Sequence, residues 1–171
     1  MSDRRRRLAQ RERRTGWITA SLYLFFFALL AVVAGPVLAD RLMGALKAGG
    51  ECRILRVVDA DTYRLDCEVI GRQQAQLLGA NAPATREVGC RAEYLAGMRA
   101  KWAARRMLWG ADEIVARIDG FGWDDRTLVI LRLDGEGMAS RLVEQGHAMQ
   151  DAGYSTQGWC AGELDGRMQD G

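Results

Sequence analysis

Residues 52–70 read CRILRVVDADTYRLDCEVI, and this stretch decides the fold. β-branched and alternating runs flank Asp59-Ala60-Asp61, and Asp is a favoured turn residue, so the pattern predicts a β-hairpin. Gly71-Arg72 predicts a second turn. The folded part of the chain is therefore expected to open with a three-stranded meander, with strands over 52–58, 62–70 and 74–78.

The residues after this meander change their periodicity. Apolar residues recur at helical spacing over 90–109, and Gly110 is a suitable stop. Further strands are expected over 114–118 and 127–133, with a short helix over 138–145. Three strands, a helix, two strands and a helix predict a mostly β domain with helices, namely a five-stranded β-barrel of the oligonucleotide/oligosaccharide-binding (OB) type rather than a βαβ fold.

Upstream of the meander, residues 17–39 read WITASLYLFFFALLAVVAGPVLA and contain no charged residue. A helix of this length spans roughly 34 Å, enough for a hydrocarbon core of about 30 Å. We interpret it as a single transmembrane helix. A cleaved signal peptide ending at Val37-Leu38-Ala39 is the alternative, but the apolar run exceeds the roughly 7–15 residues of a signal h-region.

Charge is distributed unevenly along the chain. Residues 1–16 hold seven arginines against Asp3 and Glu12, a net of +5; because the chain as a whole carries +2, the remainder carries −3. Positively charged flanks stay in the cytoplasm, which predicts a single-pass protein of the inner (cell) membrane with its C-terminal domain in the periplasm or outside the cell. The mildly acidic remainder makes nucleic acid an unexpected partner.

Four cysteines follow the apolar span: Cys52, Cys67, Cys90 and Cys160. An even number in an exported domain suggests disulfides. The hairpin turn places Cys52 opposite Cys67, which leaves Cys90 to pair with Cys160. A zinc site is the alternative, but the chain has no Cys-x-x-Cys pair and only one histidine.

Several segments together resemble the staphylococcal nuclease (thermonuclease) family over roughly residues 52–160. VVDADT at 57–62 is similar to the family's Val-x-Asp-Gly-Asp-Thr, and QLLGANAPAT at 76–85 to its Arg-Leu-x-Gly-x-Asp-x-Pro-Glu-Thr. The remaining similarities are Cys90-Arg-Ala-Glu93 with Gly97, Asp125-Arg-Thr-Leu128, Asp134-Gly135 and LVEQGHA at 142–148.

The resemblance implies calcium-assisted hydrolysis of phosphodiester bonds, with carboxylates holding the metal, two arginines neutralising the phosphate and a glutamate activating water. Carried over by position, the metal residues are Asp59, Asp61 and Asn81. Gln76 replaces the first arginine, Ala84 replaces the glutamate, and Arg126 alone matches the second arginine. Gln76 lacks the positive charge and Ala84 lacks a base, so no residue is assigned a catalytic role.

These replacements favour a degenerate, membrane-anchored member of the family, a pseudonuclease that acts as a binding or scaffold module and as an accessory subunit of a membrane complex. The alternative is a tethered calcium-dependent nuclease, and a third class is a binder of small ligands or saccharides. Expected partners are the lipid bilayer and another membrane or periplasmic protein. No cofactor is expected, with Ca²⁺ the one candidate. Asp59 and Asp61 also fit plain turn residues.

The expected organisation then has five parts. These are a basic cytoplasmic segment over 1–16, a transmembrane helix over 17–39, a linker over 40–50, the nuclease-like OB-fold domain over 51–160 and a tail over 161–171.

Overall fold

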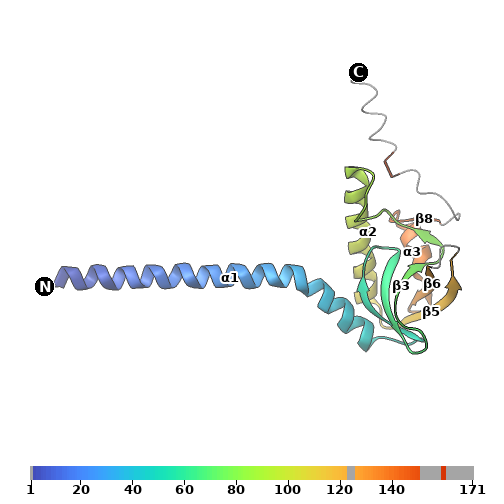
Figure 1. Ribbon diagram of the computed structural model, residues 1–171, viewed down its shortest axis with the longest axis horizontal. Coiled ribbons are helices and arrows are strands. Elements are labelled where there is room, and N and C mark those ends of the chain that lie inside the picture. The colour runs from blue at the N-terminus through green and yellow to red at the C-terminus, as the bar shows by residue number, and fades with distance from the viewer. Residues whose placement is uncertain (1, 123–125, 151–158, 161–171) are drawn as a thin grey trace, which may run out of the picture. The chain divides into compact units, whose positions relative to one another are not determined.

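The computed structural model describes residues 2–122, 126–150 and 159–160 (Figure 1). The chain divides into two compact units, Met1–Leu38 and Ala39–Gly171. Helix α1 (Ser2–Leu46) runs through the first unit and into the second. Its segment Ser21–Leu46 is long and apolar enough to cross a membrane, and it overlaps the span expected over 17–39. The protein therefore has one candidate membrane helix in its described part.

The last residues of α1 belong to the second unit. The carboxylate of Asp40 is buried and accepts hydrogen bonds from the backbone N–H of Val57 at 3.1 Å, from Arg105 Nε at 3.2 Å and from Trp109 Nε1 at 3.1 Å. Gly44 packs so closely that an added Cβ would lie 2.1 Å from the Ile54 carbonyl oxygen. The segment expected as a linker over 40–50 thus begins as a helix packed against the domain.

The main sheet contains the predicted strands in the order β1-β2-β3-β6-β5, with β7 beside β6. Pairing is antiparallel except between β3 and β6, which are parallel. The bounds are β1 (Cys52–Val57), β2 (Thr62–Cys67), β3 (Gly71–Leu77), β5 (Ile114–Phe121), β6 (Thr127–Leu133) and β7 (Glu136–Gly137). A second, two-stranded sheet joins β4 (Ala80–Asn81) to β8 (Met149–Gln150).

The described residues form no closed sheet, so the predicted barrel is present only as this open sheet. One bridge links the two edges of the strand order, because Ala48, just before β1, pairs with Ile114 of β5. The Ile114 N–H donates to Lys47 O at 2.8 Å, and the Gly49 N–H donates to Ile114 O at 2.9 Å. The chain entering β1 therefore runs beside β5 for a short distance.

The third strand begins earlier than the sequence suggested. Gly71 pairs with Cys67 and is already part of β3, so Gly71-Arg72 is not the turn that we predicted. The turn lies over residues 68–70, where Val69 is 93% exposed. Gly71 has a φ of +69°, which glycine adopts without the steric cost that a Cβ imposes, so the strand can start there.

Two helices cover the sheet, as predicted. Helix α2 (Arg91–Gly110) starts at Cys90, whose Sγ accepts from the Glu93 N–H at 3.4 Å, and it buries a row of small residues against the core. Helix α3 (Met138–Glu144) buries Met138 and Leu142. Figure 1 shows α2 along one side of the sheet. Tyr63 is fully buried among these elements, and its hydroxyl donates to the Ala60 carbonyl.

Both predicted disulfides are confirmed. Cys52 and Cys67 are direct partners across β1 and β2, and they are bonded. Cys90 is bonded to Cys160, which ties the start of α2 to a residue 70 positions later. Closing a loop of this size stabilises the folded state by about 4 kcal/mol in the chain-entropy account.

Candidate functional site

The residues that resemble the nuclease site come together around the β1–β2 turn. Asp59 and Asp61 lie in this turn, where the Asp59 N–H donates to Thr62 O at 3.0 Å and the Thr62 N–H donates to Asp59 O at 3.2 Å. Thr62 is the register partner of Gln76 on β3, and the Leu77 N–H donates to Asp61 O at 2.7 Å. The hairpin turn therefore sits against the end of β3, as the motif requires.

Asp61 is held by protein donors on both carboxylate oxygens. Oδ2 accepts from the Ala82 N–H at 2.8 Å, and Oδ1 accepts from the Thr62 hydroxyl at 2.9 Å. The side chain is 7% exposed. Burial raises the pKa of this carboxyl, the hydrogen bonds from Ala82 and Thr62 oppose the rise, and the charge of Asp59 adds to it. Asp61 thus joins the turn to the 80–85 loop.

Asp59 makes the corresponding contact with the other end of that loop. Its Oδ1 accepts a hydrogen bond from the Thr85 hydroxyl. The two carboxylates therefore hold the loop at Ala82 and at Thr85. This is a structural use of both side chains, and it accounts for Asp and Thr at these positions without a metal ion.

Gln76 and Arg126, the two positions that match the family's arginines, are in direct contact. Arg126 Nη1 donates to Gln76 Oε1 at 3.0 Å. Arg126 directly precedes β6, whose first residue Thr127 is the partner of Ala75 in the parallel β3–β6 pair, one residue before Gln76. A neutral amide accepts from the guanidinium here, whereas a second arginine would repel it.

The other two expected positions lie in the loop that precedes α2. Asn81 belongs to β4 and pairs with Met149. Ala84 and Pro83 present their carbonyls to α2, since a Cβ on Gly97 would lie 2.4 Å from Ala84 O and 2.7 Å from Pro83 O. Ala84 has no ionisable group, so the position expected to activate water is chemically inert.

The geometry therefore brings several of the predicted positions together. Asp59, Asp61 and Asn81 carry oxygen atoms of the type that binds a hard cation such as Ca²⁺. A cation beside Asp61 would oppose the rise that burial causes in its pKa. What the arrangement lacks, at the matched positions, is a second positive charge and a base.

One further group of side chains has the composition of a metal site. Cys90, Glu93 and Cys160 have ligand atoms within 4.8 Å of one another, and Glu93 Oε2 accepts from the Gly89 N–H at 2.7 Å. The two sulfurs are bonded to each other, so they offer no thiolate to a metal. The group therefore consists of the Cys90–Cys160 disulfide and Glu93, in the first turn of α2.

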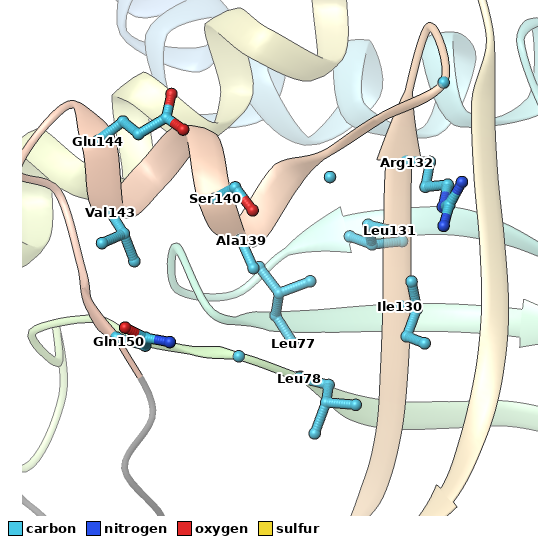
Figure 2. Close-up of a pocket in the computed structure, with 13 residues that line it drawn as sticks. Leu77, Leu78, Ile130, Leu131, Arg132, Ala139, Ser140, Val143, Glu144 and Gln150 are labelled. Carbon is cyan, nitrogen blue, oxygen red and sulfur yellow. The ribbon is translucent and has the colours of Figure 1, made fainter.

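A groove with a volume of about 690 Å³ borders the matched positions, since its lining includes Leu77, next to Gln76, and Gln150, the partner of Ala80. Figure 2 shows it between α3 and β6, with Leu77 and Leu78 at the end of β3 between them. Its polar side chains include Arg132, Ser140, Glu144 and Gln150. None of the positions matched to the family's metal ligands, arginines and glutamate lines the groove.

Two residues near Asp59 were not predicted from the sequence to contribute to the candidate site. Thr85 was quoted as part of a motif but not assigned a role, and its hydroxyl donates to Asp59 Oδ1. Lys101 on α2 was not singled out. It lies four residues after Gly97, hence on the helix face that packs against the 83–84 loop, and this spacing was the available signal.

Comparison with known proteins adds no identification: no protein-family model matches the chain, and no curated protein is significantly similar to it.

Proposed function

We propose that the chain is a membrane-anchored, exported pseudonuclease, in which a nuclease-like domain of the OB type serves as a binding or scaffold module. The strand order β1-β2-β3-β6-β5, the parallel β3–β6 pair and a helix between β3 and β5 support the fold assignment. The Ala48–Ile114 bridge supports a barrel-like closure. The candidate membrane helix and both disulfides support export.

The observation that carries the loss of catalysis is the Gln76–Arg126 hydrogen bond. A nuclease of this design needs two cations aimed at the phosphate, and here the only matched arginine donates to an amide that replaced the other. Ala84 removes the base. Loss of one preorganised donor costs about 10²–10³ in rate, and loss of acid–base help about 10²–10⁴.

An anchored domain without chemistry is best explained as part of a complex, so the proposed partner is another membrane or periplasmic protein. Purification of the tagged full chain from native membranes in several mild detergents tests this. We expect one protein to co-purify in fixed stoichiometry, and not with an unrelated single-span protein expressed at the same level. Isolation as a lone monomer in every detergent would contradict the scaffold role.

The alternative, a tethered calcium-dependent nuclease, is favoured by the convergence of Asp59, Asp61 and Asn81 near the matched Arg126. The pseudonuclease and the nuclease can be distinguished by measuring the melting temperature and DNA cleavage with and without calcium. A calcium-dependent rise in melting temperature without DNA cleavage would mean that the metal site persists without catalysis. A rise accompanied by cleavage would favour the enzyme.

A further inference from the structure

Two arginines face each other on the outer side of the β1–β2 hairpin. Arg56 and Arg64 are register partners across the antiparallel pair, so their side chains extend on the same face of the sheet. Both are exposed. Like charges directly opposite each other destabilise a sheet unless something neutralises them.

Two further cations, Lys101 and Arg86, are considered with this pair. Lys101 is half-buried on α2. Burial lowers the pKa of its ammonium group, Asp59 opposes this, and the neighbouring charges of Arg105, Arg56 and Arg86 lower the pKa further. The charges of Arg56 and Arg86 thus both act on Lys101. Together with Arg64, these three residues are called the basic cluster below.

Hydrogen bonds of neighbouring residues hold the backbone near Arg56, Arg86 and Lys101. Lys101 lies one turn from Gly97, which contacts the 83–84 loop, and one turn from Arg105, which binds Asp40. Arg56 directly precedes Val57, whose N–H also donates to Asp40. Arg86 follows Thr85, whose hydroxyl donates to Asp59.

The basic cluster lacks anions of its own. Among the described residues, no ion pair or side-chain hydrogen bond involves any of its four members, whereas Arg53, Arg105 and Arg141 each contact a carboxylate. Asp59 is the one carboxylate that acts on Lys101, and Asp59 is hydrogen-bonded to Thr85. The exposed Arg56–Arg64 pair, with the positive charges of Arg86 and Lys101, suits a phosphate group.

The cluster belongs to the same compact unit as Asp40, the first charged residue after the charge-free stretch over 17–39. Asp40 directly follows Val37-Leu38-Ala39 in sequence, and its carboxylate contacts the backbone adjacent to Arg56. We propose that Arg56, Arg64, Arg86 and Lys101 form a binding site for the phosphate of an anionic phospholipid headgroup. This inference rests on the membrane anchoring in the proposed function. Each Lys or Arg near an anionic membrane surface contributes about 1 kcal/mol to such binding.

Native mass spectrometry of the full chain in detergent micelles, titrated with phosphatidylglycerol or phosphatidylcholine, tests the proposal. We expect wild type to prefer phosphatidylglycerol. Arg56→Gln/Lys101→Gln should weaken phosphatidylglycerol binding by about thirtyfold, and Arg64→Gln alone by about fivefold. The matched control is Arg99→Gln/Arg106→Gln, which removes the same charge from exposed positions of α2 and should leave the affinity unchanged.

The N-terminal arginines are present in every variant, so they cannot produce the difference. Equal phosphatidylglycerol binding by wild type, Arg64→Gln and the double variant would overturn the proposal. Inorganic phosphate and a short thymidine oligonucleotide are added without lipid as separate arms. Binding of either with comparable affinity, lost in the same variants, would assign the cluster to a soluble phosphate ligand and overturn the lipid assignment. Release of the protein from membranes by alkaline carbonate would instead refute the anchoring on which the inference rests.

Discussion

The carboxyl of Asp61 gives the candidate site a measurable acid–base signature. Burial raises its pKa above the ordinary value of 3.8, so the folded state binds the proton more tightly than the unfolded state does. The contribution of Asp61 to the free energy of unfolding is therefore fully present below about pH 3.8 and is lost as the pH rises through the raised pKa. We predict that Asp61→Asn, which can still accept from the Ala82 N–H, abolishes this dependence and is at least as stable as wild type at pH 7.

Thermal unfolding of the full chain in detergent, followed by tryptophan fluorescence across the acid range, provides the measurement. Asp134 is the control of opposite sign, because hydrogen bonds from the Glu113 and Asp112 N–H groups lower its pKa. Its stabilisation is present above the ordinary value and is lost as the pH falls. A profile for Asp61→Asn identical to that of wild type would show that Asp61 is not held as described.

Asp40 is the residue that joins the end of α1 to the domain. Its ion pair with Arg105 is buried on both sides, so Asp40→Asn leaves a buried guanidinium without its counter-charge. We predict a loss of about 3 kcal/mol in the free energy of unfolding. The control is Arg53→Gln, which breaks the exposed Arg53–Asp66 pair and should cost less than about 1 kcal/mol. Equal effects in chemical denaturation would refute the anchoring role of Asp40.

At the scale of elements, the packing of α2 against the 83–84 loop depends on a missing side chain. A Cβ at Gly97 would collide with two backbone carbonyls, which cannot rotate away. We predict that Gly97→Ala lowers the free energy of unfolding by about 1–3 kcal/mol. Gly110, on the same helix, has nothing within 4 Å of an added Cβ, and Gly110→Ala should instead stabilise by about 0.5–1 kcal/mol. Two changes of the same sign would mean that α2 does not approach the loop closely.

The elements that could be predicted from the sequence are those specified by residues close together in the chain. Alternation and the Asp59-Ala60-Asp61 turn specify the β1–β2 hairpin, and the hairpin in turn sets the Cys52–Cys67 partnership. The pairing of β4 with β8 has no such local signal, because it joins two short segments about 70 residues apart in the chain. The start of β3 was misjudged because Gly71 fits both a turn and a strand end.

The candidate site shows the same division. Matching motifs placed Asp59, Asp61, Gln76 and Arg126 in one region, and the structure brings them together. The motifs could not show that Asp61 is satisfied by Ala82 and Thr62, or that Asp59 holds Thr85. These contacts depend on how a loop folds back on a turn, which is a tertiary property. The burial of Asp40 is likewise invisible in a sequence where it simply ends an apolar run.

At the scale of the whole molecule, the arginine-rich start and the apolar helix predict a fixed topology. We predict that a reporter fused after Gly171 is active only outside the cytoplasm, because positively charged flanks are retained inside. Replacing the seven arginines of residues 1–16 with glutamine should reduce this bias and yield mixed orientations. A reporter active in the cytoplasm for the wild-type chain would contradict both the topology and the export of the disulfide-bonded domain.

The central claim is that the domain keeps a nuclease-like arrangement without the chemistry. Cleavage of single-stranded DNA and RNA by wild type and by Gln76→Arg/Ala84→Glu/Asn81→Asp, each with calcium and with chelator, tests it most directly. We expect no chelator-sensitive cleavage by wild type and weak, calcium-dependent cleavage by the triple variant. Cleavage should be weak because replacing Gln76 removes the amide that now accepts a hydrogen bond from Arg126. Robust chelator-sensitive cleavage by wild type would contradict the account.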